Sequence, residues 1–148
     1  YWSAMTHIPN IGLFVMGGAY NQSNNFLYDN VDYFDESSSS PSWTSISNRP
    51  EAKSGASLEN YPTRELSVLF GGHKLDANSS PFITKETIIL NFDIDGTFHH
   101  ELENYPIAPP ERSRHCSAYD HENDEIVIFG GIGENEFLQD TWTFTLNE

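Results

Sequence analysis

Three runs of apolar residues in this chain each end in a pair of glycines. The pairs are Gly17 and Gly18, Gly71 and Gly72, and Gly130 and Gly131. The first glycines of successive pairs are 54 and 59 residues apart. Near-constant spacing of this kind indicates that one supersecondary unit has been repeated, so the repeat constrains the fold more than any other feature.

Between the glycine pairs, the chain has the composition of strands and turns. Helical periodicity is not sustained anywhere, whereas β-branched and aromatic residues cluster in short runs between turn signals. In the second unit we expect strands near residues 53–59, 65–70, 87–93 and 97–102. A polar loop is expected at 74–81, and Asp95 with Gly96 predicts a hairpin turn.

The flanking units are expected to be incomplete. The first holds strands at 11–16, 28–34 and 43–46, and the chain begins inside what should be its first strand. The third holds strands near 115–119 and 125–129 and through 141–144, with no residues left for a fourth. We therefore expect the chain to be a piece of a longer polypeptide.

The third unit resembles the kelch repeat in three places, and the other two units resemble it less. Its Arg-x-x-His, apolar-Gly-Gly and Asp-x-Trp patterns fall on Arg112 with His115, Gly130 with Gly131, and Asp140 with Trp142. In the second unit, Lys53 and Ala56 stand for the Arg and His, and the third strand has no Trp. The first unit keeps mainly the glycine pair and the run at 31–34.

The resemblance implies an all-β fold of kelch-type β-propeller blades, each a four-stranded antiparallel sheet, in an incomplete ring. The partial propeller spans 1–148, with blades at about 1–48, about 49–104 and about 109–148, the last blade lacking its final strand. Propellers have about 4–8 blades, so the remaining blades must come from the same parent polypeptide or from a second chain. The motif residues are expected to be structural: Arg112 and His115 tie strands together, and Trp142 fills space between blades.

The composition of the chain limits the classes of partner it can bind and indicates its cellular compartment. A net charge of −15, from 22 acidic and 7 basic residues, argues against binding nucleic acid or anionic membranes. A solvated acidic surface is the simplest reading, and a basic protein partner is compatible with it. The single cysteine, Cys116, favours a reducing, cytoplasmic compartment, although glycosylation-like tripeptides at Asn21 and Asn78 leave secretion open.

We expect no metal, no cofactor and no catalytic residues in this chain. His99 and His100 are adjacent on a predicted strand and point to opposite faces, which suits one metal ion poorly. The segment 91–96 imitates a calcium loop, but Leu102 stands where a glutamate is needed. Copper-radical propeller enzymes need a Cys–Tyr crosslink, and Cys116 falls where a small buried residue is expected.

The resemblance places partner-binding residues just after each glycine pair and just after the first-strand Arg. Carried over, these positions are Ala19, Tyr20, Asn21, His73, Lys74, Ile132, Gly133 and Glu134, together with Ser54 and Ser113. The expected function is therefore a protein–protein interaction scaffold or adaptor that presents propeller loops to a partner. The alternatives are part of an oxidoreductase or sugar-processing propeller whose catalytic residues lie in other blades, and a purely architectural half that joins a partner chain.

Overall fold

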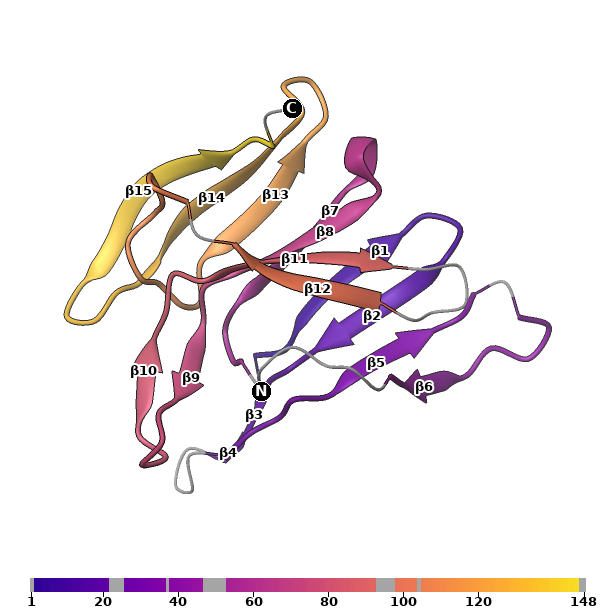
Figure 1. Ribbon diagram of the computed structural model, residues 1–148, viewed down its shortest axis with the longest axis horizontal. Helices are drawn as coiled ribbons and strands as arrows, with labels where there is room; N and C mark the ends of the chain where they lie inside the picture. The colour runs from indigo at the N-terminus through magenta and orange to yellow at the C-terminus, as the bar shows by residue number, and fades with distance from the viewer. Residues whose placement is uncertain are drawn as a thin grey trace.

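The computed structural model folds the described residues into three main antiparallel sheets that follow one another along the chain, plus two short hairpins (Figure 1). The structure describes residues 2–21, 26–36, 38–46, 53–92, 98–103 and 105–146. Within them, the one helical element is a 3-10 turn, Pro62–Arg64. The expectation of an all-β chain is confirmed, while the predicted turn at Asp95 and Gly96 lies outside the described residues.

The first sheet has four strands in the order β1-β2-β5-β6. They are β1 (Ala4–Ile8), β2 (Gly12–Met16), β5 (Val31–Phe34) and β6 (Trp43–Ser45), with the separate hairpin of β3 (Ala19–Asn21) and β4 (Phe26–Leu27) after the glycine pair. The expectation that the chain begins inside the first strand is wrong. Strand β1 is five residues long and pairs along its whole length with β2, from Ala4 opposite Met16 to Ile8 opposite Gly12.

The second sheet is also four-stranded, in the order β12-β11-β8-β7. Its strands are β7 (Ser57–Tyr61), β8 (Leu66–Phe70), β11 (Thr87–Phe92) and β12 (Phe98–Glu103). The segment expected as a polar loop instead forms a hairpin of β9 (His73–Leu75) and β10 (Pro81–Ile83). Asp76 closes its turn, because one carboxylate oxygen accepts the backbone N–H groups of Asn78 and Ser80, each at 2.8 Å.

The third sheet has three strands in the order β13-β14-β15. They are β13 (Cys116–Asp120), β14 (Glu125–Ile132) and β15 (Phe137–Phe144). In the first two sheets a fourth strand pairs with the third, but no described strand pairs with the outer edge of β15. The described strands form an open array of sheets and do not close into a barrel (Figure 1).

Two apolar cores join the three sheets face to face, because β8 buries both of its sides. Leu69 packs toward the first sheet, in a core that contains Phe14 and Met16. Val68 and Phe70, on the opposite side of the same strand, pack with Ile126 and Ile128 of the third sheet. Each buried side chain of this size contributes about 1.5–3 kcal/mol of stability, so the sheets are held together mainly by these two layers.

The outer face of the third sheet is apolar and uncovered. Phe129 occupies in β14 the position that Phe70 occupies in β8, since each lies opposite the first residue of the preceding strand. Phe70 is 3% exposed and Phe129 is 53% exposed. Cys116 lies opposite Phe129 and is exposed too, so the expectation that this cysteine is buried is wrong.

The outer face of the first sheet shows the same contrast. Met5 lies opposite the next-to-last residue of β2, as Leu58 lies opposite the next-to-last residue of β8. Leu58 is 3% exposed because the first sheet covers it, whereas Met5 is 60% exposed. The array therefore ends in uncovered apolar side chains on both flanks.

Candidate functional site

The glycine pairs are the points where the backbone of one sheet meets the backbone of the next. Gly72 donates its N–H to the carbonyl of Arg112 at 2.8 Å, and Gly18 donates to the carbonyl of Lys53 at 2.8 Å. Gly71 has a φ of +66°, and a Cβ there would lie 2.5 Å from the Arg112 oxygen. Only glycine fits such a position, so the pairs serve as structural joints between sheets.

Arg112 is fully buried and fastens the third sheet from within. Its Nη1 and Nη2 each donate to one oxygen of Asp140 at 2.8 Å, and Nη1 also donates to the Gly130 carbonyl at 2.9 Å. The guanidinium holds the pKa of Asp140 well below its usual range against the opposing effect of burial, and the Trp142 N–H, 2.6 Å from the carboxylate, adds to this lowering. The expected structural role of these motif residues fits this bidentate pair.

In the second sheet, two lysines share one carboxylate. Nζ of Lys53 lies 2.9 Å from one oxygen of Glu86, and Nζ of Lys74 lies 2.7 Å from the other. The side chains of both lysines are nearly inaccessible, at 3% and 10% exposed. Burial alone raises the pKa of Glu86, but the bonds and charges of Lys74 and Lys53 outweigh it and lower the pKa. Both ammonium groups are therefore bound to one carboxylate inside the fold, which compensates one of their two positive charges.

His115 links the third sheet to the second. Its Nε2 lies 2.8 Å from the Ser57 hydroxyl, and burial, with a smaller effect from the Arg112 charge, lowers its pKa to about 4. The neighbouring Ser117 donates to Glu59 of β7 at 2.6 Å, and burial raises the pKa of that glutamate in spite of this bond. The ring is therefore neutral at physiological pH and acts as part of the joint between sheets.

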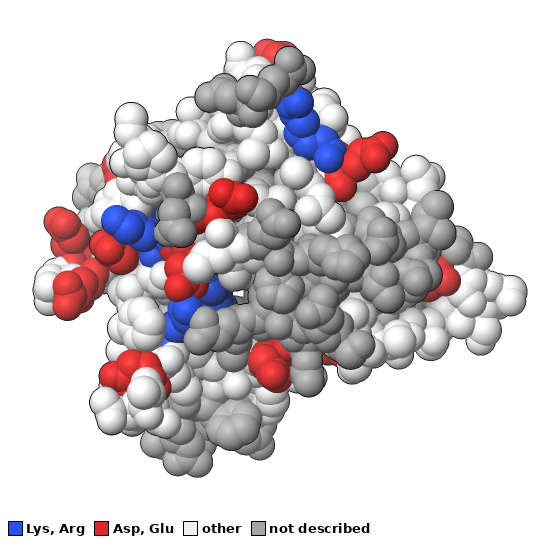
Figure 2. Space-filling view, viewed as in Figure 1, with Lys and Arg blue, Asp and Glu red and all other residues white. Residues whose placement is uncertain are grey.

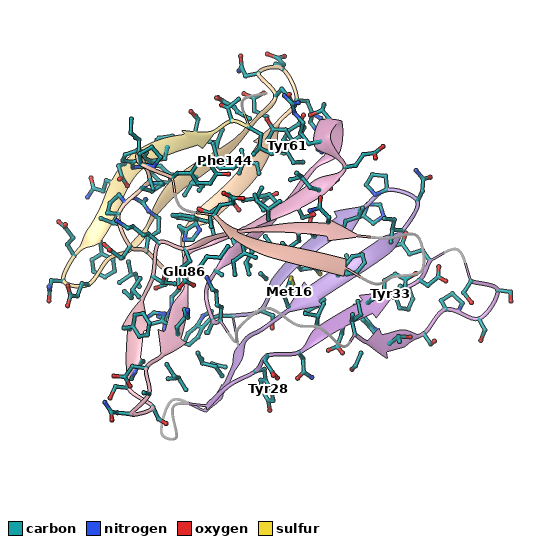
Figure 3. The ribbon with its side chains drawn as sticks, viewed as in Figure 1. Met16, Tyr28, Tyr33, Tyr61, Glu86 and Phe144 are labelled. Carbon is teal, nitrogen blue, oxygen red and sulfur yellow. The ribbon has the colours of Figure 1, made fainter. Side chains whose placement is uncertain are left out.

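A groove opens between the second and third sheets, at the end of the array that carries the glycine pairs. It has a volume of about 500 Å³ and is lined by His73, Pro81, Phe82, Ile83, Glu111 and Glu134. A second hollow of about 380 Å³ shares Phe82, Ile83 and Glu111 with it and adds Glu103 and Tyr105, among others. Figure 3 shows Glu86 near the base of the β9–β10 hairpin, and Tyr61 and Phe144 at the far end of the array.

The structure brings two of the predicted binding residues to one groove. His73 and Glu134 line the same groove, one after each glycine pair. Burial, with a smaller effect from the Arg114 charge, lowers the pKa of His73, so the ring is neutral at pH 7. The side chains of Tyr20 and Asn21 lie outside the described residues.

Three residues that the sequence predicts to face a partner are instead buried. Ser54 is 4% exposed and Ser113 is fully buried, because the backbone of each pairs with the strand after the glycine pair, at His73 and at Ile132. Lys74 is 8% exposed because it points to Glu86. These three residues therefore offer little surface to a partner.

Sequence reasoning missed Phe82, Glu111 and Tyr105. Phe82 is 44% exposed and directly follows the loop expected at 74–81, and the apolar triplet of Pro81, Phe82 and Ile83 was the available signal for a strand there. Glu111 and Tyr105 lie in the connection between the second and third sheets. Their contribution to the groove depends on how the sheets pack, which no local pattern reports.

Metal and membrane sites are not found in the described part of the chain. No group of three or more His, Cys, Asp or Glu side chains there is arranged to hold a metal ion. Over the same residues, no helix is long and apolar enough to cross a membrane. Figure 2 shows that the blue areas of Lys and Arg adjoin red areas of Asp and Glu on the face in view.

Comparison with known proteins identifies a similar fold and no family. No family model and no curated protein matches the chain. The chain is similar to the solved structure of YjhT, with a TM-score of 0.73, at 12% sequence identity. The alignment covers 99% of this chain and 43% of the YjhT chain, so the present chain spans less than half the length of that protein.

Proposed function

We propose that this chain supplies three consecutive blades of a kelch-type β-propeller that binds a protein partner at the end carrying the glycine pairs. The repeated joint supports the blade assignment. The second glycine of one sheet bonds the Lys53 or Arg112 carbonyl of the next sheet, both at 2.8 Å. Sheets that repeat the same contact are related by a constant rotation, which gives a ring of blades where that rotation closes after a whole number of copies.

Further blades on both flanks follow from the same repeat. Phe129 and Met5 are exposed at positions where the sheets within the array bury Phe70 and Leu58. No described strand pairs with the outer edge of β15, whereas in the other two sheets β12 and β6 pair at the corresponding edge. The alignment covers 43% of the YjhT chain, which is compatible with a complete propeller that is larger than these three sheets. The other blades come from the same polypeptide or from a second chain.

The observation that carries the binding function is the open groove between the β9–β10 hairpin and the loop after Gly131. It places His73, Phe82 and Glu134 together on two hairpins of neighbouring sheets. By contrast, Asp140, Glu86 and His115, which have perturbed pKa values, are each bonded to a group of the fold. The groove residues are therefore available to a partner, while the titratable groups with perturbed pKa values are used within the fold. This contrast favours a scaffold that binds through its loops over an enzyme whose catalytic residues lie in this chain.

Affinity capture with paired variants tests this proposal. The full-length protein is immobilised and its bound proteins are quantified by mass spectrometry, alongside Phe82→Ser in the groove and Trp43→Ser in β6. Both aromatic side chains are exposed, at 44% and 53%, so each variant removes an exposed aromatic side chain, Phe82 inside the groove and Trp43 outside it. We expect at least one partner to be lost with Phe82→Ser and retained with Trp43→Ser.

Two results would contradict the proposal. One is an identical set of captured proteins for the wild type and Phe82→Ser. The other is bound copper, or turnover of an alcohol or a glycan by the full-length protein, because either would assign the chain to a propeller enzyme. The second result would leave the arrangement of the blades unchanged and would replace the scaffold function.

A further inference from the structure

The groove lined by His73, Phe82, Glu111 and Glu134 combines apolar side chains with carboxylates and has no lysine or arginine among its described lining residues. From this combination we infer that it binds a peptide carrying Lys or Arg beside apolar side chains. This inference rests on the proposed function and specifies the chemistry of the partner. It concerns the two adjoining hollows that share Phe82, Ile83 and Glu111.

The apolar side chains of the groove come mainly from β10 and from the connection to the third sheet. Phe82 is 44% exposed and lies opposite Lys74 in the β9–β10 hairpin. Ile83 and Tyr105 are partly buried beside it. Exposed aromatic and aliphatic side chains in a concave surface favour contact with apolar side chains of a bound peptide.

The charge around these apolar side chains is negative. Glu111 and Glu134 line the first hollow, Glu111 and Glu103 line the second, and both Glu111 and Glu134 are exposed. Within the described part of the chain, neither Glu111 nor Glu134 forms an ion pair. A cationic side chain in the first hollow would therefore meet two exposed carboxylates that form no ion pair with a described residue.

The basic residues near the groove differ in how far they offset these carboxylates. Lys85 is exposed and lines the second hollow beside Glu103 and Glu111, whereas no lysine or arginine is among the described residues that line the first hollow. Lys53 and Lys74 are held by Glu86, and Arg112 is held by Asp140. The Arg114 guanidinium lies over the ring of Trp2, 3.7 Å from its centre.

The remaining titratable ring in the groove adds no positive charge. Burial and Arg114 lower the pKa of His73, so its ring is neutral at pH 7. A net charge of −15 over the whole chain further favours approach of a cation and disfavours an acidic peptide.

Direct titration with defined peptides tests the inference. The probes are three short fluorescein-labelled peptides in which Leu alternates with Arg, with Gln or with Glu. Fluorescence anisotropy measures their affinity for the full-length protein at low and at physiological ionic strength. We expect the Arg peptide to bind at least about tenfold more tightly than the Gln peptide, the Glu peptide not to bind, and added salt to weaken the binding.

Charge-matched variants locate the site. Glu111→Gln combined with Glu134→Gln removes two groove carboxylates, and Glu122→Gln combined with Glu36→Gln removes two exposed carboxylates elsewhere. We expect the groove pair to weaken the Arg peptide by about tenfold or more and the control pair to change its affinity by less than about twofold. Phe82→Ser should weaken the Arg and Gln peptides alike, because it removes the apolar contact. Thermal unfolding shows whether each variant is folded. If Phe82→Ser is unfolded, the variant with Glu111→Gln and Glu134→Gln still tests the charge preference, because both glutamates are exposed.

The results separate this inference from the proposed function. Equal affinity for the three peptides, or equal losses in the groove and control pairs, would overturn the inference. If a captured protein still depends on Phe82 while the Arg peptide does not bind, the scaffold function stands and the cationic preference is wrong. If neither the peptide nor any captured protein depends on the groove, both proposals are wrong.

Discussion

Glu86 and Asp140 occupy the same position in neighbouring sheets, although they are embedded in different sequences. Each comes directly before a threonine that lies opposite the phenylalanine preceding a glycine pair. The opposed residues are Thr87 with Phe70 in the second sheet and Thr141 with Phe129 in the third. Each carboxylate binds the basic residue that opens its unit, Lys53 for Glu86 and Arg112 for Asp140. The Arg–Asp pair of the third sheet therefore has a Lys–Glu counterpart in the second.

Removing the charge of Asp140 should destabilise the protein strongly. Asp140→Asn leaves the fully buried guanidinium of Arg112 without a counter-charge, so we expect the free energy of unfolding to fall by about 3 kcal/mol or more. Urea denaturation measures the loss. Arg112→Met combined with Asp140→Asn should recover part of it, because no buried charge remains. A stability equal to the wild type in Asp140→Asn would show that the pair is not a structural fastening.

Alanine at the glycine pairs should report whether a neighbouring sheet is present. Gly71→Ala adds a left-handed alanine and a clash with the Arg112 carbonyl, so we expect a loss of about 3 kcal/mol or more. Gly130→Ala has the same left-handed backbone, but its nearest contact is the Leu138 oxygen at 3.2 Å, so about 1–2 kcal/mol is expected in the 148-residue chain.

Gly133→Ala serves as the control for these glycine variants. Its added Cβ would meet no atom closer than 3.6 Å, so we expect a change within about 0.5 kcal/mol. Thermal unfolding of the three variants gives the comparison. In a protein that carries the next blade, the cost of Gly130→Ala should rise toward that of Gly71→Ala, and no rise there would count against a fourth blade at this flank.

Phe70 and Phe129 should respond differently to truncation. Phe70→Ala removes a side chain that is 3% exposed and should cost about 3–5 kcal/mol. Phe129→Ala removes one that is 53% exposed, so the 148-residue chain should lose less than about 1 kcal/mol and become more soluble. Denaturant titration and the concentration at which aggregation begins are the measurements. Equal costs for the two variants in the isolated chain would contradict the assignment of Phe129 to an uncovered flank.

Acid should weaken the joint between the second and third sheets through His115. Burial lowers the pKa of this ring from 6.5 to about 4, so between these pH values the unfolded chain takes up a proton that the folded chain does not. The contribution of His115 to stability is therefore complete above pH 6.5 and is lost as the pH falls toward 4, by about 2 kcal/mol.

The comparison with His115→Gln isolates this effect from other titrating groups. Glu59, on the same joint, has a raised pKa and acts in the opposite direction, because its contribution is lost as the pH rises above 4.5. Both proteins contain Glu59, so it cancels in the difference between their unfolding free energies. We expect that difference to change between pH 7 and pH 4, and parallel curves would show that His115 is not the titrating group.

Much of the strand pattern could be predicted from the sequence, because it depends on neighbours within a few residues. The apolar run before Gly71 and the run of Ile88, Ile89 and Leu90 in β11 identify strands locally, and the predicted segments overlap β8 and β11. The β9–β10 hairpin was missed because polar residues at its turn dominate the composition of the segment. The sequence predicted a first strand already in progress at the start of the chain, and the pairing with β2 instead sets β1 at Ala4–Ile8.

The amino-acid sequence by itself determined the repeat, the all-β character and the positions where only glycine is tolerated. Tertiary structure decided which residues are joints and which are surface: Lys74 and Ser113 became buried, while Phe82 and Glu111 came to line a groove beside His73. The physical reason is distance along the chain. The contact between His115 and Ser57 spans 58 residues, and such pairings depend on how whole sheets pack and not on local propensity.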